Sequence, residues 1–487
     1  MDTQNRLSPI GLATVLLGAF LAIADFFIVN VALPTMDTDL HPTAAMLQLF
    51  VAGYGVPYAL MLVLGGRLGD LFGRRRLFMA GVASFTLFSL LCGIAPTATV
   101  LIAFRAAQGA SAAFMVPQVL ATIQSATSGQ SRARAIGLYG ATAGIAAVVG
   151  QVAGGLIVDA NIAGQGWRPI FLVNVPIGIV ALALASRYVP STRSTEPARV
   201  DVPGTGLLAV AVLGLLVPLT EGRTLGWPLW SIGLLALVVP AAVAFTLVER
   251  RLEAANRHPL VPPSMLRDQG MRAGLVIAVL FFAGFAAFMF VSAIALQTGA
   301  HLSPLGSGLA LTPLALAFFA TTFVTPQLTA RYGRSIIAVG ALVQAVGLAG
   351  VAFTLHDAWP HVDAATLAPA MVIAGIGQGL VLPPLFGFVL AGVPAARAGV
   401  GAGILTTTQQ SALALGVATL GSIFLSYDGP QALGMRDAFI AVLAAQIAAA
   451  LLVAVAVRGL PEPARARAAA EQARAETPAE VEYVEAA

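Results

Sequence analysis

The sequence predicts an all-α membrane protein of fourteen transmembrane helices: two pseudo-symmetric six-helix bundles with two extra central helices. Composition, the spacing of apolar segments and an internal repeat support this prediction. The 487 residues are 58% apolar and only 10% charged, with a mean hydropathy of +0.88. Soluble domains carry about 25% charged residues. The composition therefore excludes an ordinary soluble enzyme and indicates a chain embedded in a bilayer.

The residue types present also exclude several kinds of chemistry. All 26 basic residues are arginine, so the chain lacks the lysine of a phosphate-binding P-loop and of a Schiff-base enzyme. The single cysteine, Cys92, excludes an internal disulfide and a cysteine-rich metal site. A histidine- and aspartate-containing loop at 356–363 is interpreted as a solvated loop and not a metal site. We therefore expect no enzyme activity, no metal and no nucleic-acid partner.

The apolar segments have the length and number of a multi-pass protein. A bilayer core of about 30 Å needs about 20 apolar residues in a helix. Fourteen such stretches follow one another, and the first, about Pro9–Pro34, is too long for a signal peptide. Their approximate centres are Ala22, Gly55, Phe85, Ser111, Val148, Val180, Gly214, Leu237, Phe285, Leu316, Gln344, Gly379, Ala414 and Gln446. The even number places both termini on one side of the membrane.

The distribution of arginine predicts which side that is. With the N-terminus in the cytoplasm, 22 of the 26 arginines fall in cytoplasmic loops and tails, as the positive-inside rule requires. Both termini are therefore predicted to be cytoplasmic. The absence of lysine and the abundance of alanine indicate a GC-rich bacterial genome, and hence the bacterial inner membrane.

Two short matches indicate an internal repeat. The loop from Gly66 to Arg74 resembles the loop 326–334 at an offset of 260 residues, and Gln108-Gly109 recurs as Gln378-Gly379 at an offset of 270. The offset exceeds the length of six helices, so two extra helices are expected between the halves. The predicted parts are a first bundle (1–190), two extra helices (200–250), a cytoplasmic linker (251–272), a second bundle (273–457) and a cytoplasmic tail (458–487).

Two formal charges lie inside the apolar segments. At 1.5 Å per residue, Asp25 and Arg105 lie about 14 Å and about 10 Å below the outer face. An intramembrane charge is costly and is by default a functional hypothesis. The alternative is an ion pair that only holds the first and fourth helices together.

Several motifs together resemble those of the major facilitator superfamily, and within it the fourteen-helix drug:proton antiporters of the multidrug efflux type. The resemblance covers about residues 10–457. Its motifs are Asp25 with Ile28–Pro34; Gly66, Leu68, Asp70, Gly73, Arg74 and Arg75; Arg105, Gln108 and Gly109; Trp167-Arg168, Phe171, Asn174, Pro176 and Gly178; and His258-Pro259-Leu260. Leu71 stands where the family usually has a basic residue.

One motif departs from the family pattern. The fifth-helix antiporter motif normally reads Gly-Pro-x-x-Gly-Gly, and this chain has Gly150, Gln151, Gly154 and Gly155. The missing proline weakens the inference of proton antiport. The glycines could provide close helix packing or a hinge that seals the proton path, and Gln151 could line the cavity.

The resemblance implies secondary active export of small hydrophobic or amphiphilic compounds, including drugs and antibiotics, by proton antiport. Asp25 would carry the proton, and Arg105 would tune the proton affinity of Asp25. No cofactor is implied besides the proton gradient. Gly66, Asp70, Gly73, Arg74 and Arg75 would form a conformational latch. The partners are then small molecules, protons and lipid. A dedicated exporter of one metabolite or lipid-like molecule, or a proton symporter, remains an alternative. The sequence leaves the oligomeric state open and is compatible with a monomer.

Further side chains are candidates for a substrate cavity between the halves. In the ninth span, Phe281, Phe285, Phe288 and Met289 share one helical face. Packing against lipid is the preferred interpretation of this face, and a drug-binding wall is the alternative. The cavity candidates are Asn30, Tyr54, Tyr58, Gln108, Met115, Phe281, Phe285, Phe288, Gln344, Gln378 and Gln409.

Overall fold

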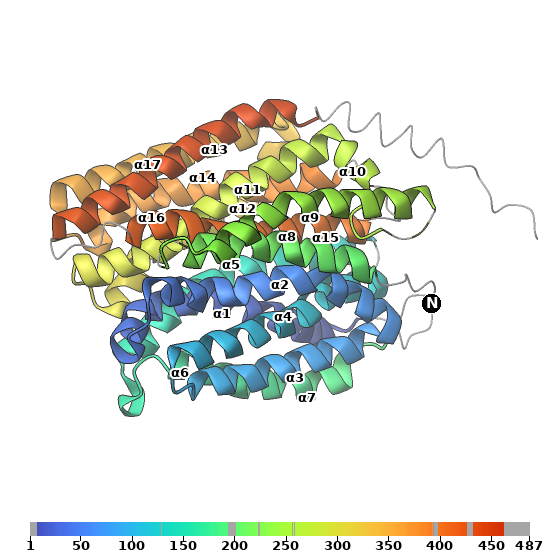
Figure 1. Ribbon diagram of the computed structural model, residues 1–487, viewed down its shortest axis with the longest axis horizontal. Coiled ribbons are helices and arrows are strands. Elements are labelled where there is room, and N and C mark those ends of the chain that lie inside the picture. The colour runs from blue at the N-terminus through green and yellow to red at the C-terminus, as the bar shows by residue number, and fades with distance from the viewer. Residues whose placement is uncertain are drawn as a thin grey trace, which may run out of the picture.

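The computed structural model describes residues 7–127, 129–192, 201–222, 225–255, 257, 259–391, 393, 398–425 and 432–461. Within these ranges the secondary structure is entirely helical. The helices run roughly parallel to the long axis of the molecule (Figure 1). This part of the prediction, an all-α fold, is confirmed.

The helices form two groups of corresponding members and an inserted pair. The first group is α1 (Pro9–Leu40), α2 (Ala44–Phe72), α3 (Arg74–Gly93), α4 (Ala98–Ala126), α5 (Gly129–Asp159), α6 (Pro169–Leu172) and α7 (Asn174–Tyr188). The inserted elements are α8 (Val202–Glu221), α9 (Leu229–Ala254) and the short α10 (Pro263–Arg267). The second group is α11 (Gln269–Ile294), α12 (Pro304–Tyr332), α13 (Ser335–Ala358), α14 (Ala364–Ala391), α15 (Ala398–Gly416), α16 (Ser422–Leu425) and α17 (Ala432–Ala456).

The two groups repeat the same pairwise packing. The contacts α2–α4, α3–α4, α1–α5 and α3–α7 of the first group correspond to α12–α14, α13–α14, α11–α15 and α13–α17 of the second. The groups meet along α5–α12 and α2–α15, which are themselves a corresponding pair. Figure 1 shows the first group below and the second above. We call these groups the first and second halves.

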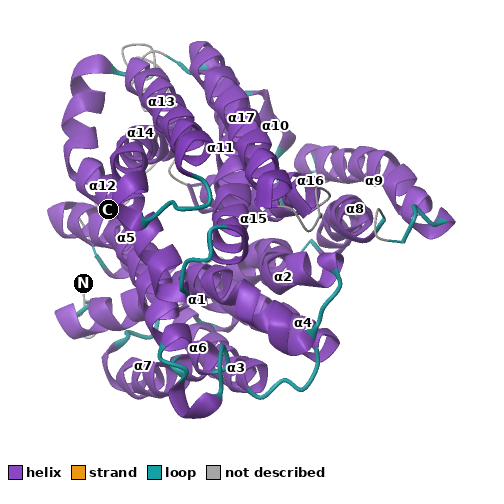
Figure 2. Cartoon of the chain, turned by 90° about the vertical axis from the view of Figure 1, so that its left-hand side faces the viewer, coloured by secondary structure: helices purple, strands orange, loops and turns teal. Residues whose placement is uncertain are grey.

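The inserted helices α8 and α9 lie at the side of the molecule (Figure 2). α8 packs on α2, where Val56 and Leu60 form a small apolar cluster with Leu216 of α8 and Ala414 of α15. α9 packs mainly on α8, and only 11% of its most apolar stretch is buried. The pair therefore covers one seam between the halves and leaves most of α9 exposed.

Polar residues fix the beginnings of several helices. Ser8 accepts a hydrogen bond from the backbone N–H of Gly11, 3.0 Å away, and satisfies one of the free amides of the first turn. The same capping starts α2, α4, α8, α11 and α12 at Thr43, Thr97, Asp201, Asp268 and Ser303. α1 continues through Pro34 to Leu40, six residues beyond the segment expected from the sequence, because proline is tolerated inside membrane helices.

Eleven helices in the described part of the chain are long and apolar enough to cross a membrane. The prediction of fourteen such segments is therefore not confirmed. The other three segments form α5, α8 and α15, but α5 and α8 contain only shorter apolar stretches, Gly144–Asp159 and Pro203–Leu219. α15 ends after 19 residues in a π-helical turn, Val417–Gly421. Within the range 251–272, which stays the predicted linker, α9 extends to Ala254 and the short α10 spans Pro263–Arg267.

Two hydrogen bonds between the halves lie toward the end of the bundle opposite the beginning of α1. The Gln297 amide donates to the carbonyl oxygen of Val31 at 2.8 Å, and the Gln48 amide donates to the Ser422 hydroxyl at 2.9 Å. Gln297 belongs to a π-helical turn, and Ser422 directly follows another. The halves are thus joined at this end, which we call the Trp167 end because Trp167 donates a hydrogen bond to Asp39 near the end of α1. The opposite end, where α1 begins and Arg74 follows α2, is called the Arg74 end.

Candidate functional site

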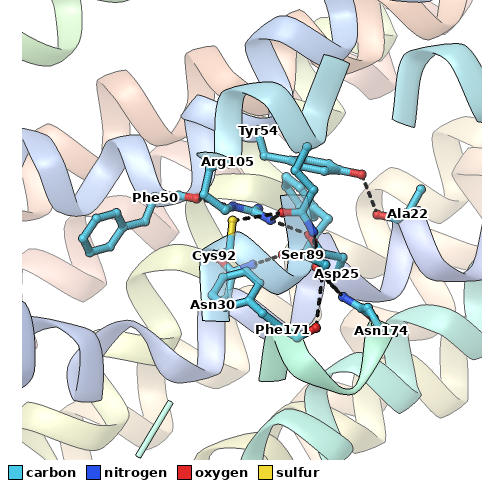
Figure 3. A network of polar contacts seen from close by, with 12 residues as sticks. Ala22, Asp25, Asn30, Phe50, Tyr54, Ser89, Cys92, Arg105, Phe171 and Asn174 are labelled. Atoms are coloured by element: carbon cyan, nitrogen blue, oxygen red, sulfur yellow. Dashed lines mark hydrogen bonds and ion pairs between the residues drawn. The ribbon is translucent and has the colours of Figure 1, made fainter. Parts of the chain in front are cut away.

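A buried polar network lies inside the first half (Figure 3). Its centre is the ion pair between Asp25 of α1 and Arg105 of α4, whose side chains are both 0% exposed. Gln108, one turn after Arg105, points to the same place because residues three apart share a helix face. Asn174 reaches the network from the first residue of α7, and Ser89 from α3. Four helices of the first half thus contribute to one site.

The carboxylate of Asp25 is surrounded by donors. Arg105 donates to one oxygen through Nη1. The other oxygen accepts from the amide of Gln108 at 3.0 Å and from the amide of Asn174 at 2.8 Å. The same two amides donate to the hydroxyl of Ser89 at 3.1 and 2.9 Å. A buried charge is tolerated only when it is paired and hydrogen-bonded, and here both oxygens have partners.

Arg105 has contacts besides the carboxylate. Its Nε donates to the carbonyl oxygen of Phe50 at 3.1 Å, and its Nη1 donates to Oε1 of Gln108 at 2.7 Å. The guanidinium carbon lies 4.5 Å from the centroid of the Tyr54 ring and 5.6 Å from that of Phe171. Aromatic faces attract a desolvated cation. These groups can hold the cation in place when the charge of Asp25 changes.

The remaining atoms of the network connect it to the surrounding helices. Ser89 donates to the carbonyl oxygen of Phe171 at 3.1 Å, where α6 ends before α7 begins. The Cys92 sulfur lies 3.7 Å from Oε1 of Gln108. The hydroxyl of Tyr54 donates to the carbonyl oxygen of Ala22 at 3.0 Å. A change at Asp25 is therefore mechanically linked to α2, α3, α4 and α7.

Sequence reasoning missed three members of this network. Asn174 belongs to a sequence motif that does not indicate its partners, and no sequence pattern distinguishes Ser89 or the position of Cys92. Gln108 and Tyr54 were expected in a cavity between the halves, and the structure places both at the ion pair inside the first half. The sequence feature that could have identified Asn174 is its position just after a proline-containing turn, at the same depth in the membrane as Asp25.

The fifth-helix motif packs closely against its neighbours. A Cβ at Gly150 would lie 2.8 Å from the carbonyl oxygen of Ala24, and one at Gly154 would lie 2.9 Å from the Ile28 side chain. At Gly155 the neighbour is the carbonyl oxygen of Pro304, 2.8 Å away in the second half. The glycines thus let α5 approach both α1 and α12, as small residues do between membrane helices.

Gln151 lies where α5 meets the second half. It is buried, and its amide donates to the sulfur of Met289 on α11 at 3.4 Å. The amide oxygen of Gln151 is buried without a hydrogen-bond partner among the described residues. The residue that replaces the family's proline is therefore a polar contact between the halves.

The predicted latch lies between α2 and α3. Gly73 has φ +98°, which favours glycine, and Gly333 occupies the corresponding turn of the second half with φ +58°. Arg74 donates to the carbonyl oxygen of Ala121 on α4 at 3.1 Å, and Arg75 donates to that of Ser186 on α7. Both bonds stay within the first half.

The other two residues of the predicted latch, Gly66 and Asp70, make no described contact between the halves. A Cβ at Gly66 would lie 3.9 Å from the Pro117 side chain of α4, an ordinary van der Waals distance. The side chain of Asp70 lies outside the described residues. The latch therefore stays a prediction.

The aromatic residues of α11 do not face lipid, so this interpretation was wrong. Phe281 and Phe288 are buried and Phe285 is half-buried. Phe285 stacks on Phe281 at 6.5 Å and meets Phe27 of α1 edge-on at 5.8 Å. Phe288 packs on Phe439 of α17. Phe281 and Phe285 thus form an aromatic contact at the boundary between the halves, because this face of α11 is turned toward α1 and not toward the bilayer.

The other cavity candidates are distributed over both halves. Asn30 is buried on α1, and its amide donates to the carbonyl oxygen of Phe26 at 2.8 Å. Tyr58 of α2 lies beside Gln410 of α15, at the boundary. Met115 packs inside the first half near Gly18 and Gly81. Gln344 and Gln378 are buried inside the second half and Gln409 is half-buried on α15.

Comparison with known proteins agrees with this architecture. Residues 15–417 match the model of the Major Facilitator Superfamily. The chain is 34% identical to a probable actinorhodin transporter of Streptomyces coelicolor, over 87% of this chain and 74% of that protein. It is 35% identical to a puromycin resistance protein of Streptomyces alboniger, over 85% and 81%.

A third relative and a solved structure extend the comparison. The chain is 33% identical to a cephamycin export protein of Amycolatopsis lactamdurans, over 90% of each chain. The fold resembles the crystal structure of a peptide transporter POT with sulfate, with a TM-score of 0.67 at 16% identity over 93% of this chain and 96% of that one. These findings show that the chain belongs to the Major Facilitator Superfamily.

Proposed function

We propose that this protein exports small hydrophobic or amphiphilic antibiotics or drugs across the bacterial inner membrane in exchange for protons. The names of the relatives support export: they include transporters or resistance proteins for actinorhodin, puromycin and cephamycin. The fully buried Asp25–Arg105 pair carries the proposal of proton coupling. In a membrane interior, such a pair is a functional site by default.

The proposed topology has fourteen spans, with α5, α8 and the segment α15–α16 added to the eleven long apolar helices. The Arg74 end, where α1 begins, is then cytoplasmic because 22 of the 26 arginines fall in the loops and tails predicted for this side. The Trp167 end faces the outside. In this proposal each half moves as one bundle, and α8 and α9 move together with the boundary between the halves that they cover.

The contacts between the halves support an assignment of the conformation. Gln297 with Val31 and Gln48 with Ser422 join the halves toward the outer end. We therefore take this conformation as closed to the outside, ready to receive substrate from the cytoplasm or the inner leaflet. In the opposite conformation these bonds would be broken and the substrate released outside.

Protonation of Asp25 supplies the coupling in this proposal. The charged carboxylate holds Arg105, Gln108 and Asn174 together. A proton would cancel that charge and release the ion pair, while the Phe50 carbonyl and the Tyr54 ring would still hold Arg105. Because the network joins four helices, the two charge states favour different packings of the first half. An incoming proton could thereby drive the return of the empty transporter.

Proton release from everted vesicles tests this proposal. A panel of lipophilic cations, neutral dyes and antibiotics is added to energised vesicles that contain wild type, Asp25→Asn or Asp437→Asn. Asp437 is a matched control because it is an exposed acid paired with its neighbour Arg436. We expect transported compounds to collapse the pH gradient with wild type and Asp437→Asn but not with Asp25→Asn.

The results also separate the alternatives. Several responding compounds indicate a multidrug exporter, and one responding compound class indicates a dedicated exporter. Full proton exchange by Asp25→Asn would refute the role of Asp25. Uptake of the compound together with protons would show symport and refute antiport.

A further inference from the structure

A small amphipathic groove lies between the end of α9 and the short helix α10, outside the first half that holds the ion pair. It has a volume of about 220 Å³. Its lining residues are Phe245, Thr246, Glu249, Arg250, Val261, Pro263, Leu266 and Arg267. Apolar side chains thus share the groove with two cations that come from different elements.

The walls of this groove are held together by specific bonds. The carboxylate of Glu249 on α9 accepts a hydrogen bond from the backbone N–H of Val261 at 2.8 Å. Glu253, one turn later, accepts from the backbone N–H of Ser264 at 3.1 Å and from its hydroxyl. The segment that carries α10 is therefore fastened to α9 along two turns. The groove is part of the fold and not a gap beside a loose loop.

The two arginines in the groove are available to a ligand. Arg250 and Arg267 are exposed and make no hydrogen bond or ion pair with the described residues. Glu249, the acid in the lining, is buried and already engaged with the backbone of Val261. Two guanidinium groups beside one engaged carboxylate favour an anion, and phosphate matches the guanidinium donors especially well.

The surroundings indicate where this anion would come from. α9 exposes Val239, Val243 and Leu247 by 68%, 53% and 50%. In a membrane these side chains face acyl chains. The groove lies at the end of this lipid-facing helix, at the cytoplasmic end in the proposed topology. A ligand there would have its charged group beside the arginines and its apolar part along α9.

We propose that this groove binds the headgroup of an anionic phospholipid of the inner leaflet. The phosphate lies between Arg250 and Arg267, and an acyl chain follows the exposed face of α9. Phe245 and Leu266 contact the part of the acyl chain that is nearest to the headgroup. Basic pockets on the cytoplasmic side of membrane helices recognise lipid headgroups in this way. The inference uses the orientation given under the proposed function, but not the substrate or the proton coupling.

Lipid retention by the purified full-length protein tests this inference. Native mass spectrometry compares bound phosphatidylglycerol with bound phosphatidylcholine for wild type, Arg250→Gln, Arg267→Gln and the double variant. A nearby arginine raises the affinity for an anionic surface about fivefold. In the double variant, the preference for phosphatidylglycerol over phosphatidylcholine should therefore fall about 25-fold. The charge-preserving double variant Arg250→Lys with Arg267→Lys should keep more of this preference than the double glutamine variant, because its charges remain while the guanidinium geometry is lost.

Arg251→Gln is the matched control. Arg251 is the next residue of the same helix, is also exposed, and does not line the groove. An equal loss with Arg251→Gln would indicate a general charge effect and overturn the site, as would an unchanged preference in the double variant. Retention of inorganic phosphate at this site without retention of the lipid would show a soluble-anion site instead. None of these readouts requires transport, so failure of the export proposal would leave them interpretable.

Discussion

Replacing Arg105 with glutamine should cost the fold far more than replacing an arginine at the surface. The side chains of Arg105 and Asp25 are both 0% exposed, and removing one partner of a buried ion pair costs about 3–5 kcal/mol. Unfolding entropy is about 2.1 cal/mol/K per residue, which gives about 1 kcal/mol/K for a chain of this length. The expected fall in Tm for Arg105→Gln is therefore about 3–5 °C.

An exposed ion pair provides the control for this prediction. The side chains of Arg436 and Asp437 are 20% and 58% exposed, and surface pairs contribute about 0–1 kcal/mol. Arg436→Gln should thus lower Tm by about 1 °C or less. Asp25→Asn combined with Arg105→Gln should be less destabilised than the sum of the two single variants, with a coupling energy of about 0.5–3 kcal/mol.

Unfolding can be followed with a thiol-reactive dye, because the chain has only one cysteine for the dye to label. Cys92 is 0% exposed and its sulfur lies 3.7 Å from Gln108 of the network. A maleimide dye that fluoresces on reaction with thiols will therefore label the protein only as this region opens. The reasoning is refuted if Arg105→Gln and Arg436→Gln melt together, or if the effects of Asp25→Asn and Arg105→Gln are simply additive.

Two further predictions concern the packing of the helices. Gly150→Ala places a Cβ 2.8 Å from the carbonyl oxygen of Ala24 and should destabilise the fold by about 1–3 kcal/mol. Its control, Gly233→Ala, places a Cβ in open space and should stabilise the fold by about 0.4–1 kcal/mol. A lower Tm for both variants in the maleimide assay would contradict this prediction. Gln48→Ala removes the bond to Ser422, worth about 0.5–1.5 kcal/mol, and should raise the outward-open population up to about tenfold. Distances between spin labels on the outer ends of α1 and α17 measure this population, and distances that match the wild type would refute the assignment of a closed outer end.

The centre of the network was predictable only in part. Two charges in apolar segments at similar depths predict that Asp25 and Arg105 meet, because neither can remain alone in a membrane. The structure places them in contact, whereas their role in proton coupling stays a prediction. Asn174 and Ser89 could not be found in this way, because small polar side chains are common in membrane helices. Their direction depends on how α3 and α7 are rotated in the packed bundle.

The aromatic face of α11 shows the same limitation. The spacing of Phe281, Phe285 and Phe288 predicts one shared face, and side chains of this kind suit either lipid or a protein interior. Hydrophobic periodicity, which separates core from solvent in a soluble protein, does not separate core from acyl chains. Only the contact of Phe285 with Phe27 across the halves shows that this face is turned inward.

The sequence by itself determined the class of fold, the family and the depth of the central charges. These depend on local properties: the length of apolar stretches, short motifs, the absence of lysine and the spacing of residues along a helix. The tertiary structure decided which side chains surround Asp25, which glycines face α1 or α12, and where α9 and α10 form a groove with two cations. Those features depend on the rotation and contact of helices that are far apart in the chain, and in a uniformly apolar sequence no local pattern specifies either.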